Sequence, residues 1–423
     1  MGGRALYHTT MQEADNATGF ISAGRMNRVL GWTMMLTGMA LAAALDPWSF
    51  NPQSGIEYAS SLRPSVRHVQ GVMLGMSLLQ LAVAHLLATP AFKRKVPQTV
   101  AALTALGATI YTAGYVLGLT WPSCHWLVLV GSLLNFTGFA YLLWAQPMGG
   151  YAVWINRIVP IVCFGMLLDF AAGLFEVFPE YFGLAFLGAD DGVRLRMMRL
   201  ARVAAIALSV LTLLSYSALS RGTADRNADG WGGFFLSCGA IGMPVILAAA
   251  CFTSLHWKYL LVLPAAAALG GVFMALISSW KHARPLECWG WALIATSTSA
   301  GMLMGLYAFD GPLETPKILG QYNETPRRLS WLAHSYCIVL GIMAIFLAKE
   351  SVGNRDSYWR TTFGTFVFIA GSAVTLGVLV IQIFAPSSTF IFFLGPAMVV
   401  VGAAVLLADG SLHATYRREP GIY

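Results

Sequence analysis

The segment that decides the fold is TPRRLSWLAHSYCIVLGIMAIFLAKE, residues Thr325 to Glu350. After its paired arginines the segment is mostly apolar, and an apolar run of about 20 residues crosses the hydrocarbon core of a bilayer as an α-helix. One histidine, His334, lies one to two turns inside the run, where a polar side chain needs a partner or a function. The segment therefore predicts a transmembrane helix with a polar residue of interest near its start.

The composition of the whole chain also indicates a membrane-embedded protein. Of its 423 residues, 57% are hydrophobic and 11% are charged, whereas soluble domains carry about 25% charged residues. The mean hydropathy is +0.66. We attribute the net charge of +7 to cytoplasmic loops rich in Lys and Arg, not to a nucleic-acid partner. The six cysteines form no CxxC motif, so neither a disulfide framework nor a zinc site is indicated.

Twelve apolar runs are predicted to cross the bilayer as helices. Their ranges are 28–45, 66–89, 98–120, 124–145, 153–178, 195–218, 231–252, 256–279, 287–308, 329–347, 361–384 and 388–408. Lys and Arg gather at one end of the predicted bundle, as in Lys93–Lys95, and the positive-inside rule makes that end cytoplasmic. The sequence thus predicts an all-α integral membrane protein with both termini cytoplasmic. Its longer outer loops are 46–65, 179–194 and 309–328.

The long outer loops recur every four helices, which suggests an internal repeat. The helices after them begin RPSVRHVQGVMLGM, RMMRLARVAAIALS and RRLSWLAHSYCIVL, and their alignment brings His68, Arg202 and His334 into one column. We expect three four-helix repeats between cytoplasmic tails at 1–24 and 411–423. The repeats span residues 25–150, 151–284 and 285–410. The alternative is that any twelve-helix protein can be divided into three parts.

This layout resembles the catalytic subunit of the haem-copper oxidase superfamily, in which helices 2, 6 and 10 carry metal-binding histidines near the outer surface. The segments VRHVQGVMLGMSLL and WLAHSYCIVLGIMAIF are similar to the family's helices 2 and 10. Tyr336 stands where the second histidine of helix 10 is expected, and the predicted helices 6 and 7 lack the copper-ligand histidines. The resemblance implies a low-spin haem site without an oxygen-reducing haem–copper centre.

His68 and His334 are the predicted ligands of one b-type haem, because neutral imidazole binds haem iron. Arg67, Arg327 and Arg328 lie at the level where cations would pair with the haem propionates. The alternative is that both histidines are interfacial residues bonded to loop carbonyls.

A second predicted pair is Asp169 with Arg202. A lone arginine about two turns deep in a membrane helix is costly and is normally paired, and adjacent antiparallel helices bring these two residues to similar depth. We predict a structural ion pair, with a proton or substrate relay as the alternative.

Three functions fit these observations. The first is a subunit of a redox or electron-transfer complex, such as a respiratory complex, that binds haem b and contacts other membrane subunits in a bacterial inner membrane. The second is a secondary transporter of a small solute, although transporters usually consist of two six-helix halves. The third is a non-catalytic structural subunit, including a relative of the oxidases that has lost its cofactors. No catalytic residue is predicted, and enzyme activity stays open.

Overall fold

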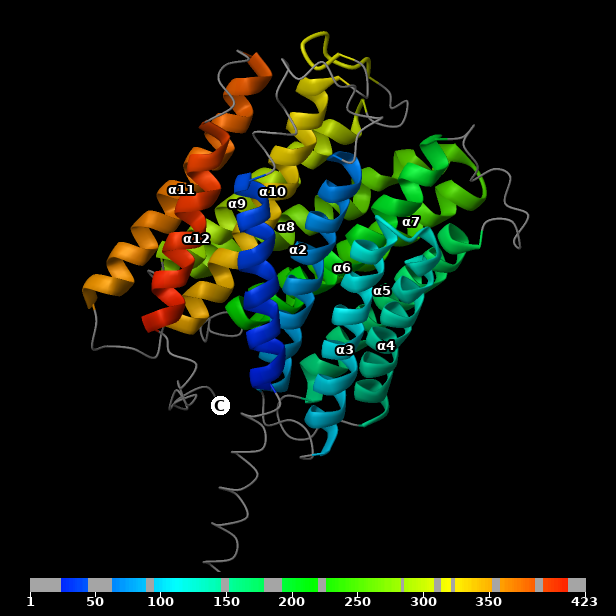
Figure 1. The fold of residues 1–423 in the computed structure, drawn as a ribbon, viewed down its shortest axis with the longest axis horizontal. Coiled ribbons are helices and arrows are strands. Elements are labelled where there is room, and N and C mark those ends of the chain that lie inside the picture. The colour runs from blue at the N-terminus through cyan, green and yellow to red at the C-terminus, as the bar shows by residue number, and fades with distance from the viewer. Residues whose placement is uncertain are drawn as a thin grey trace, which may run out of the picture.

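The computed structural model describes residues 24–44, 63–88, 95–145, 152–178, 192–219, 226–282, 285–307, 313–320, 324–351, 358–384 and 391–409. Within these ranges the chain is all-helical, with twelve α-helices and no strand (Figure 1). The first helix covers residues 24–44. It is followed by α2 (Arg63–Leu87), α3 (Lys95–Gly118), α4 (Trp126–Trp144), α5 (Ala152–Val177), α6 (Gly192–Leu219), α7 (Arg226–Phe252), α8 (Val262–Lys281), α9 (Pro285–Gly305), α10 (Thr325–Glu350), α11 (Tyr358–Phe384) and α12 (Ile391–Asp409). The predicted all-α class is confirmed.

Nine of the helices in the described ranges are long and apolar enough to cross a membrane, which indicates a protein embedded in a lipid bilayer. They are α2 to α8, α10 and α11. α12 contributes the shorter apolar stretch Phe392–Ala408. α9 carries Glu287 and a run of Ser and Thr at 296–299, and these polar residues lower its hydropathy.

Several helices begin earlier than predicted, at the expense of the outer loops. α2, α6 and α10 start at Arg63, Gly192 and Thr325, so each takes a few residues from the loop expected before it. In α10 a proline in the first turn supports this start, because its fixed φ suits a helix and its missing N–H needs no partner there. The span expected at 256–279 begins as a 3₁₀ helix, η6 (Leu255–Leu261), before α8. Most of both predicted tails lies outside the described residues.

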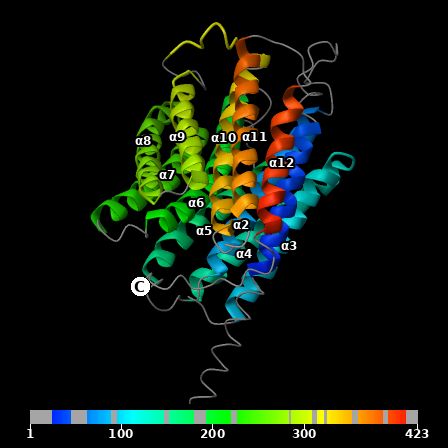
Figure 2. The same cartoon turned by 90° about the vertical axis from the view of Figure 1, so that its left-hand side faces the viewer.

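α2 ties distant parts of the bundle together. It packs against its neighbour α3 and also against α6 and α10. α6 further contacts α8, and α10 contacts α12, which are equivalent pairs in the predicted repeats. α11 and α12 lie side by side in both views (Figures 1 and 2). The threefold symmetry and the cytoplasmic location of the termini stay predictions.

Glycines allow two helix pairs to approach closely, as small residues do in membrane bundles. A methyl group added at Gly131 of α4 would lie 2.5 Å from the backbone nitrogen of Tyr111 on α3. Similarly, a methyl group at Gly290 of α9 would lie 2.6 Å from the carbonyl oxygen of Gly341 on α10. The close contact between α3 and α4 places Tyr111 of α3 directly beside α4.

Candidate functional site

Asp169 and Arg202 meet inside the helical bundle. Arg202 Nε donates a hydrogen bond to Asp169 Oδ1 at 2.8 Å. The two residues are only 2% and 6% exposed, and they come from the adjacent helices α5 and α6. The two side chains that the sequence analysis paired are thus brought together. A buried charge of either sign is tolerated here because its partner lies at hydrogen-bond distance.

Two further side chains complete this group, which we call the charge cluster: Asp169, Arg202, Tyr111 and Ser132. The Tyr111 hydroxyl on α3 accepts a hydrogen bond from Arg202 Nη2 at 2.8 Å and donates one to Asp169 Oδ1 at 3.3 Å. Ser132 on α4 donates to Asp169 Oδ2 at 2.5 Å. The cluster therefore joins four helices, and both carboxylate oxygens have donors. Sequence reasoning missed Tyr111 and Ser132.

Aromatic rings lead from the charge cluster toward one end of the bundle. The ring of Tyr115, one turn further along α3, lies 5.4 Å from that of Tyr111 between centroids. It also lies 4.8 Å from the His68 ring and 6.1 Å from the His125 ring. His68 is exposed, whereas Tyr115 and His125 are half-buried. His125 ends η3 (Pro122–His125), at the end of the bundle that the sequence analysis predicts to face outward.

The contact between α2 and α10 is made by a different pair from the predicted one. Gln70 Nε2 donates to the Tyr336 hydroxyl at 3.1 Å. Gln70 and Tyr336 each stand two residues after a histidine, His68 and His334. Positions two apart in a helix of 3.6 residues per turn point in nearly opposite directions. The two histidines therefore face away from the shared contact.

His334 instead lies against α9. Its Nδ1 is 2.9 Å from the Ser297 hydroxyl and 3.0 Å from the Ser297 carbonyl oxygen. A methyl group added at Gly301 would lie 2.7 Å from His334 Cε1, so the ring occupies the space that this glycine leaves. With His68 against α3 and His334 against α9, the arrangement does not favour one iron held by both imidazoles. The shared haem stays a prediction.

The predicted propionate-binding arginines are described only in part. The side chain of Arg67 lies outside the described residues. Arg327 is 8% exposed; it donates to Thr315 Oγ1 at 3.3 Å and lies 5.6 Å above the Tyr307 ring. Arg328 is half-buried. Within the described ranges, no three His, Cys, Asp or Glu side chains gather as a metal site.

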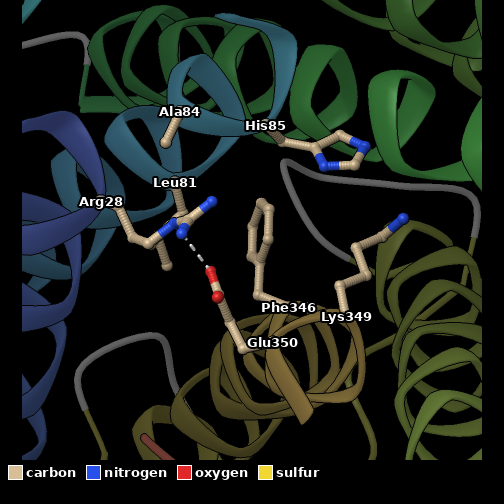
Figure 3. Close-up of a pocket in the computed structure, with 7 residues that line it drawn as sticks. All are labelled: Arg28, Leu81, Ala84, His85, Phe346, Lys349 and Glu350. Atoms are coloured by element: carbon tan, nitrogen blue, oxygen red, sulfur yellow. Dashed lines mark ion pairs between the residues drawn. The ribbon is translucent and has the colours of Figure 1, made fainter. Parts of the chain in front are cut away.

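A small open cavity lies at the other end of the bundle, between the first helix, α2 and α10 (Figure 3). Arg28 Nε lies 3.1 Å from Glu350 Oε1, and the two side chains are 19% and 22% exposed. Figure 3 shows His85 and Lys349 on the other side of the Phe346 ring. The predicted orientation makes this the cytoplasmic end.

Close to this cavity lies a group of fully buried polar residues, Asn27, Gln80 and Thr104, which we call the amide cluster. Asn27 Nδ2 donates to Gln80 Oε1 at 2.6 Å and to Thr104 Oγ1 at 2.9 Å. Gln80 Nε2 donates to the Thr104 carbonyl oxygen at 3.1 Å. The cluster ties the first helix to α2 and α3.

No protein-family model matches the chain, and no curated protein sequence matches it either. Nothing in these comparisons links the chain to the haem-copper oxidases. The function is therefore inferred from the geometry of the site alone.

Proposed function

We propose that this protein moves protons across the membrane and that the charge cluster is its buried working site. The proposal develops the relay alternative for Asp169 and Arg202 and belongs to the transporter class. The observation that carries it is the double role of the Tyr111 hydroxyl, which accepts from Arg202 and donates to Asp169. The guanidinium does not give up its proton, so Arg202 orients the hydroxyl; the remaining lone pair of the hydroxyl can take up a proton while its own O–H proton passes to Asp169.

The charge cluster is suited to select protons over other ions. Arg202 repels metal cations, and the Asp169 carboxylate repels anions. A proton needs no wide passage, because it moves along hydrogen bonds between groups that already touch. Its arrival on Asp169 gives a neutral acid beside the Arg202 guanidinium, and its departure restores the ion pair.

The ring contacts support an entrance at the predicted outer surface. The rings of His68 and His125 both contact the Tyr115 ring, and His68 is exposed. Imidazole gains and loses protons near neutral pH, so a histidine at the surface can collect them from solvent. The Tyr115 ring lies between these histidines and Tyr111.

The test is proton uptake by liposomes that contain the purified protein, driven by a potassium diffusion potential and followed with a trapped pH dye. We expect uptake by the wild type and a loss of about tenfold or more in Asp169→Asn, which removes the carboxylate. Thr137→Val is the control, because the Thr137 hydroxyl is exposed and, among the described residues, bonds within its own helix at the Leu133 carbonyl oxygen. Uptake no faster than in empty liposomes would reject the proposal.

The second candidate is the redox function, with His334 as a ligand of a b-type haem. The observation in its favour is that Ser297 holds His334 Nδ1, and histidines that bind metal through Nε2 usually have Nδ1 held in this way. A low-spin haem would supply one-electron transfer. Reduced-minus-oxidised spectra of the purified protein should then show a sharp b-type band that His334→Ala abolishes. A clean preparation without that band would remove the candidate.

A further inference from the structure

We propose that the proton path continues from the charge cluster to the opposite end of the bundle. In this scheme Asn135 and the amide cluster bind internal water, and the path ends in the cavity at Arg28 and Glu350. The inference rests on the proposed proton transfer and adds the inner half of the route. Its residues come from the first helix and from α2, α3, α4 and α10.

The first step inward is Asn135, which is 1% exposed and lies one turn beyond Ser132 on α4. Its Nδ2 faces the Met76 sulfur at 3.9 Å, a weak acceptor. Its Oδ1 has no hydrogen-bond partner among the described residues. A buried amide left in this state is costly, and ordered water is the usual partner of such groups. Asn135 therefore indicates a water site.

The spacing along α3 suits such water sites. Tyr111 and Thr104 are seven residues apart, which is about 10 Å at 1.5 Å per residue. Asn135 lies between them, because a methyl group added at Gly107 would be 2.7 Å from Asn135 Oδ1. Each half of this rise along the helix is then about 5 Å, which is similar to the length of two hydrogen bonds through one water.

In the proposed path, the amide cluster links the water site at Asn135 to the cavity. Asn27 Oδ1 is a second buried acceptor without a partner among the described residues. Asn27 adjoins Arg28 in the chain, and Gln80 adjoins Leu81, and both of these neighbours line the cavity (Figure 3). Water bound at Asn27 would thus lie next to helix turns that also supply the wall of the cavity.

Protons balance along this route. One proton enters at the outer histidines for each proton released at the cavity, and the only bonds that form or break are O–H and N–H. The amides of Asn135, Asn27 and Gln80 take no proton; they orient the waters that pass it on. Glu350, paired with Arg28, is the carboxylate that lines the cavity at the predicted cytoplasmic end.

Hydroxyl-radical labelling tests the water site without reference to transport. Radicals generated by X-rays from bound water oxidise side chains that touch it, even buried ones. Met76 and Met343 both belong to the apolar core and are 3% and 0% exposed; Met76 lies beside Asn135, and Met343 serves as the dry control. We expect several-fold more oxidation at Met76 than at Met343, and a loss of this excess in Asn135→Leu. Equal oxidation of the two methionines would overturn the inference.

Proton uptake in liposomes separates this inference from the proposed function. Asn135→Leu should lower uptake about tenfold or more, because an apolar side chain excludes the water, whereas Asn135→Ser should retain most of it. If the wild type and Asn135→Leu take up protons equally while Asp169→Asn fails, the inner route is wrong and the proposed function stands. If the wild type takes up no protons, both the proposed function and the inner proton route are wrong, whatever the labelling shows. If Asn135→Leu does not fold, Gln80→Leu takes its place, with the same outcomes.

Discussion

Two regions of the bundle, the first six helices and α11, use buried polar side chains in different ways. In the first six helices these side chains bond across helices: the charge cluster joins four helices and the amide cluster joins three. In α11, by contrast, Ser372 and Thr375 donate to carbonyl oxygens of their own helix, at 2.8 Å each. Across helices, Ser372 accepts a neutral hydrogen bond from Trp289 Nε1 of α9 at 3.0 Å, and no charged group takes part in it. The comparison places the proposed proton transfer in the charge and amide clusters and gives α11 a supporting role.

The largest expected effect is on the charge cluster. Arg202→Ala leaves the Asp169 carboxylate buried without its cation and should lower the free energy of unfolding by about 3–5 kcal/mol. Thr375→Val in α11 removes a bond that the helix makes with itself and should cost about 1 kcal/mol or less. Denaturant unfolding in mixed micelles measures both.

The double variant Asp169→Leu with Arg202→Met sharpens this prediction. It removes both charges and should recover much of the stability that Arg202→Ala loses. If Arg202→Ala and Thr375→Val lower the free energy of unfolding by similar amounts, the contrast between the charge cluster and α11 is wrong.

A smaller effect is expected from close packing between α11 and α12. A methyl group added at Gly395 would lie 2.5 Å from the backbone nitrogen of Thr375, whereas at Gly377 it would meet nothing within 4 Å. Gly395→Ala should therefore cost about 1–3 kcal/mol. Gly377→Ala should be neutral or stabilising by up to about 1 kcal/mol, because alanine favours a helix. If the two variants have the same free energy of unfolding, close packing at Gly395 does not stabilise the contact between α11 and α12.

The smallest effect is expected in the amide cluster. A double-mutant cycle of Asn27→Ala and Gln80→Ala should give a coupling energy of about 0.5–1.5 kcal/mol, typical of hydrogen bonds between membrane helices. The same cycle between Asn27 and Ser372, which lies on α11, should give none. Coupling in the second cycle but not in the first would contradict the hydrogen bonds described here.

The positions of the membrane helices, which depend on length and hydropathy, are predicted well from the sequence. All twelve predicted spans coincide with helices of the structure, because long apolar runs have few alternatives. Asp169 and Arg202 could be paired because a charge in an apolar run stands out and its depth can be counted from the helix end. The helix starts at Arg63, Gly192 and Thr325 were placed too late, since the first turns are polar and read as loop.

The direction in which a side chain points could not be predicted in the same way. Alignment of the repeats set His68 and His334 at one depth, but it did not fix the rotation of α2 and α10. Gln70 and Tyr336 occupy the facing positions instead. Tyr111 and Ser132 gave no signal at all, because single Tyr and Ser residues are ordinary in membrane helices, and only the packing of four helices gives them a role.

The most direct test of the proposed proton transfer is the uptake rate of Tyr111→Phe compared with the wild type in liposomes. The variant removes only the hydroxyl that links Arg202 to Asp169 and keeps the ring, so the protein should fold with a loss of about 1–2 kcal/mol. Proton transfer through this hydroxyl predicts that uptake falls about tenfold or more in Tyr111→Phe and is unchanged in Thr137→Val. Uptake by Tyr111→Phe at the wild-type rate would contradict it.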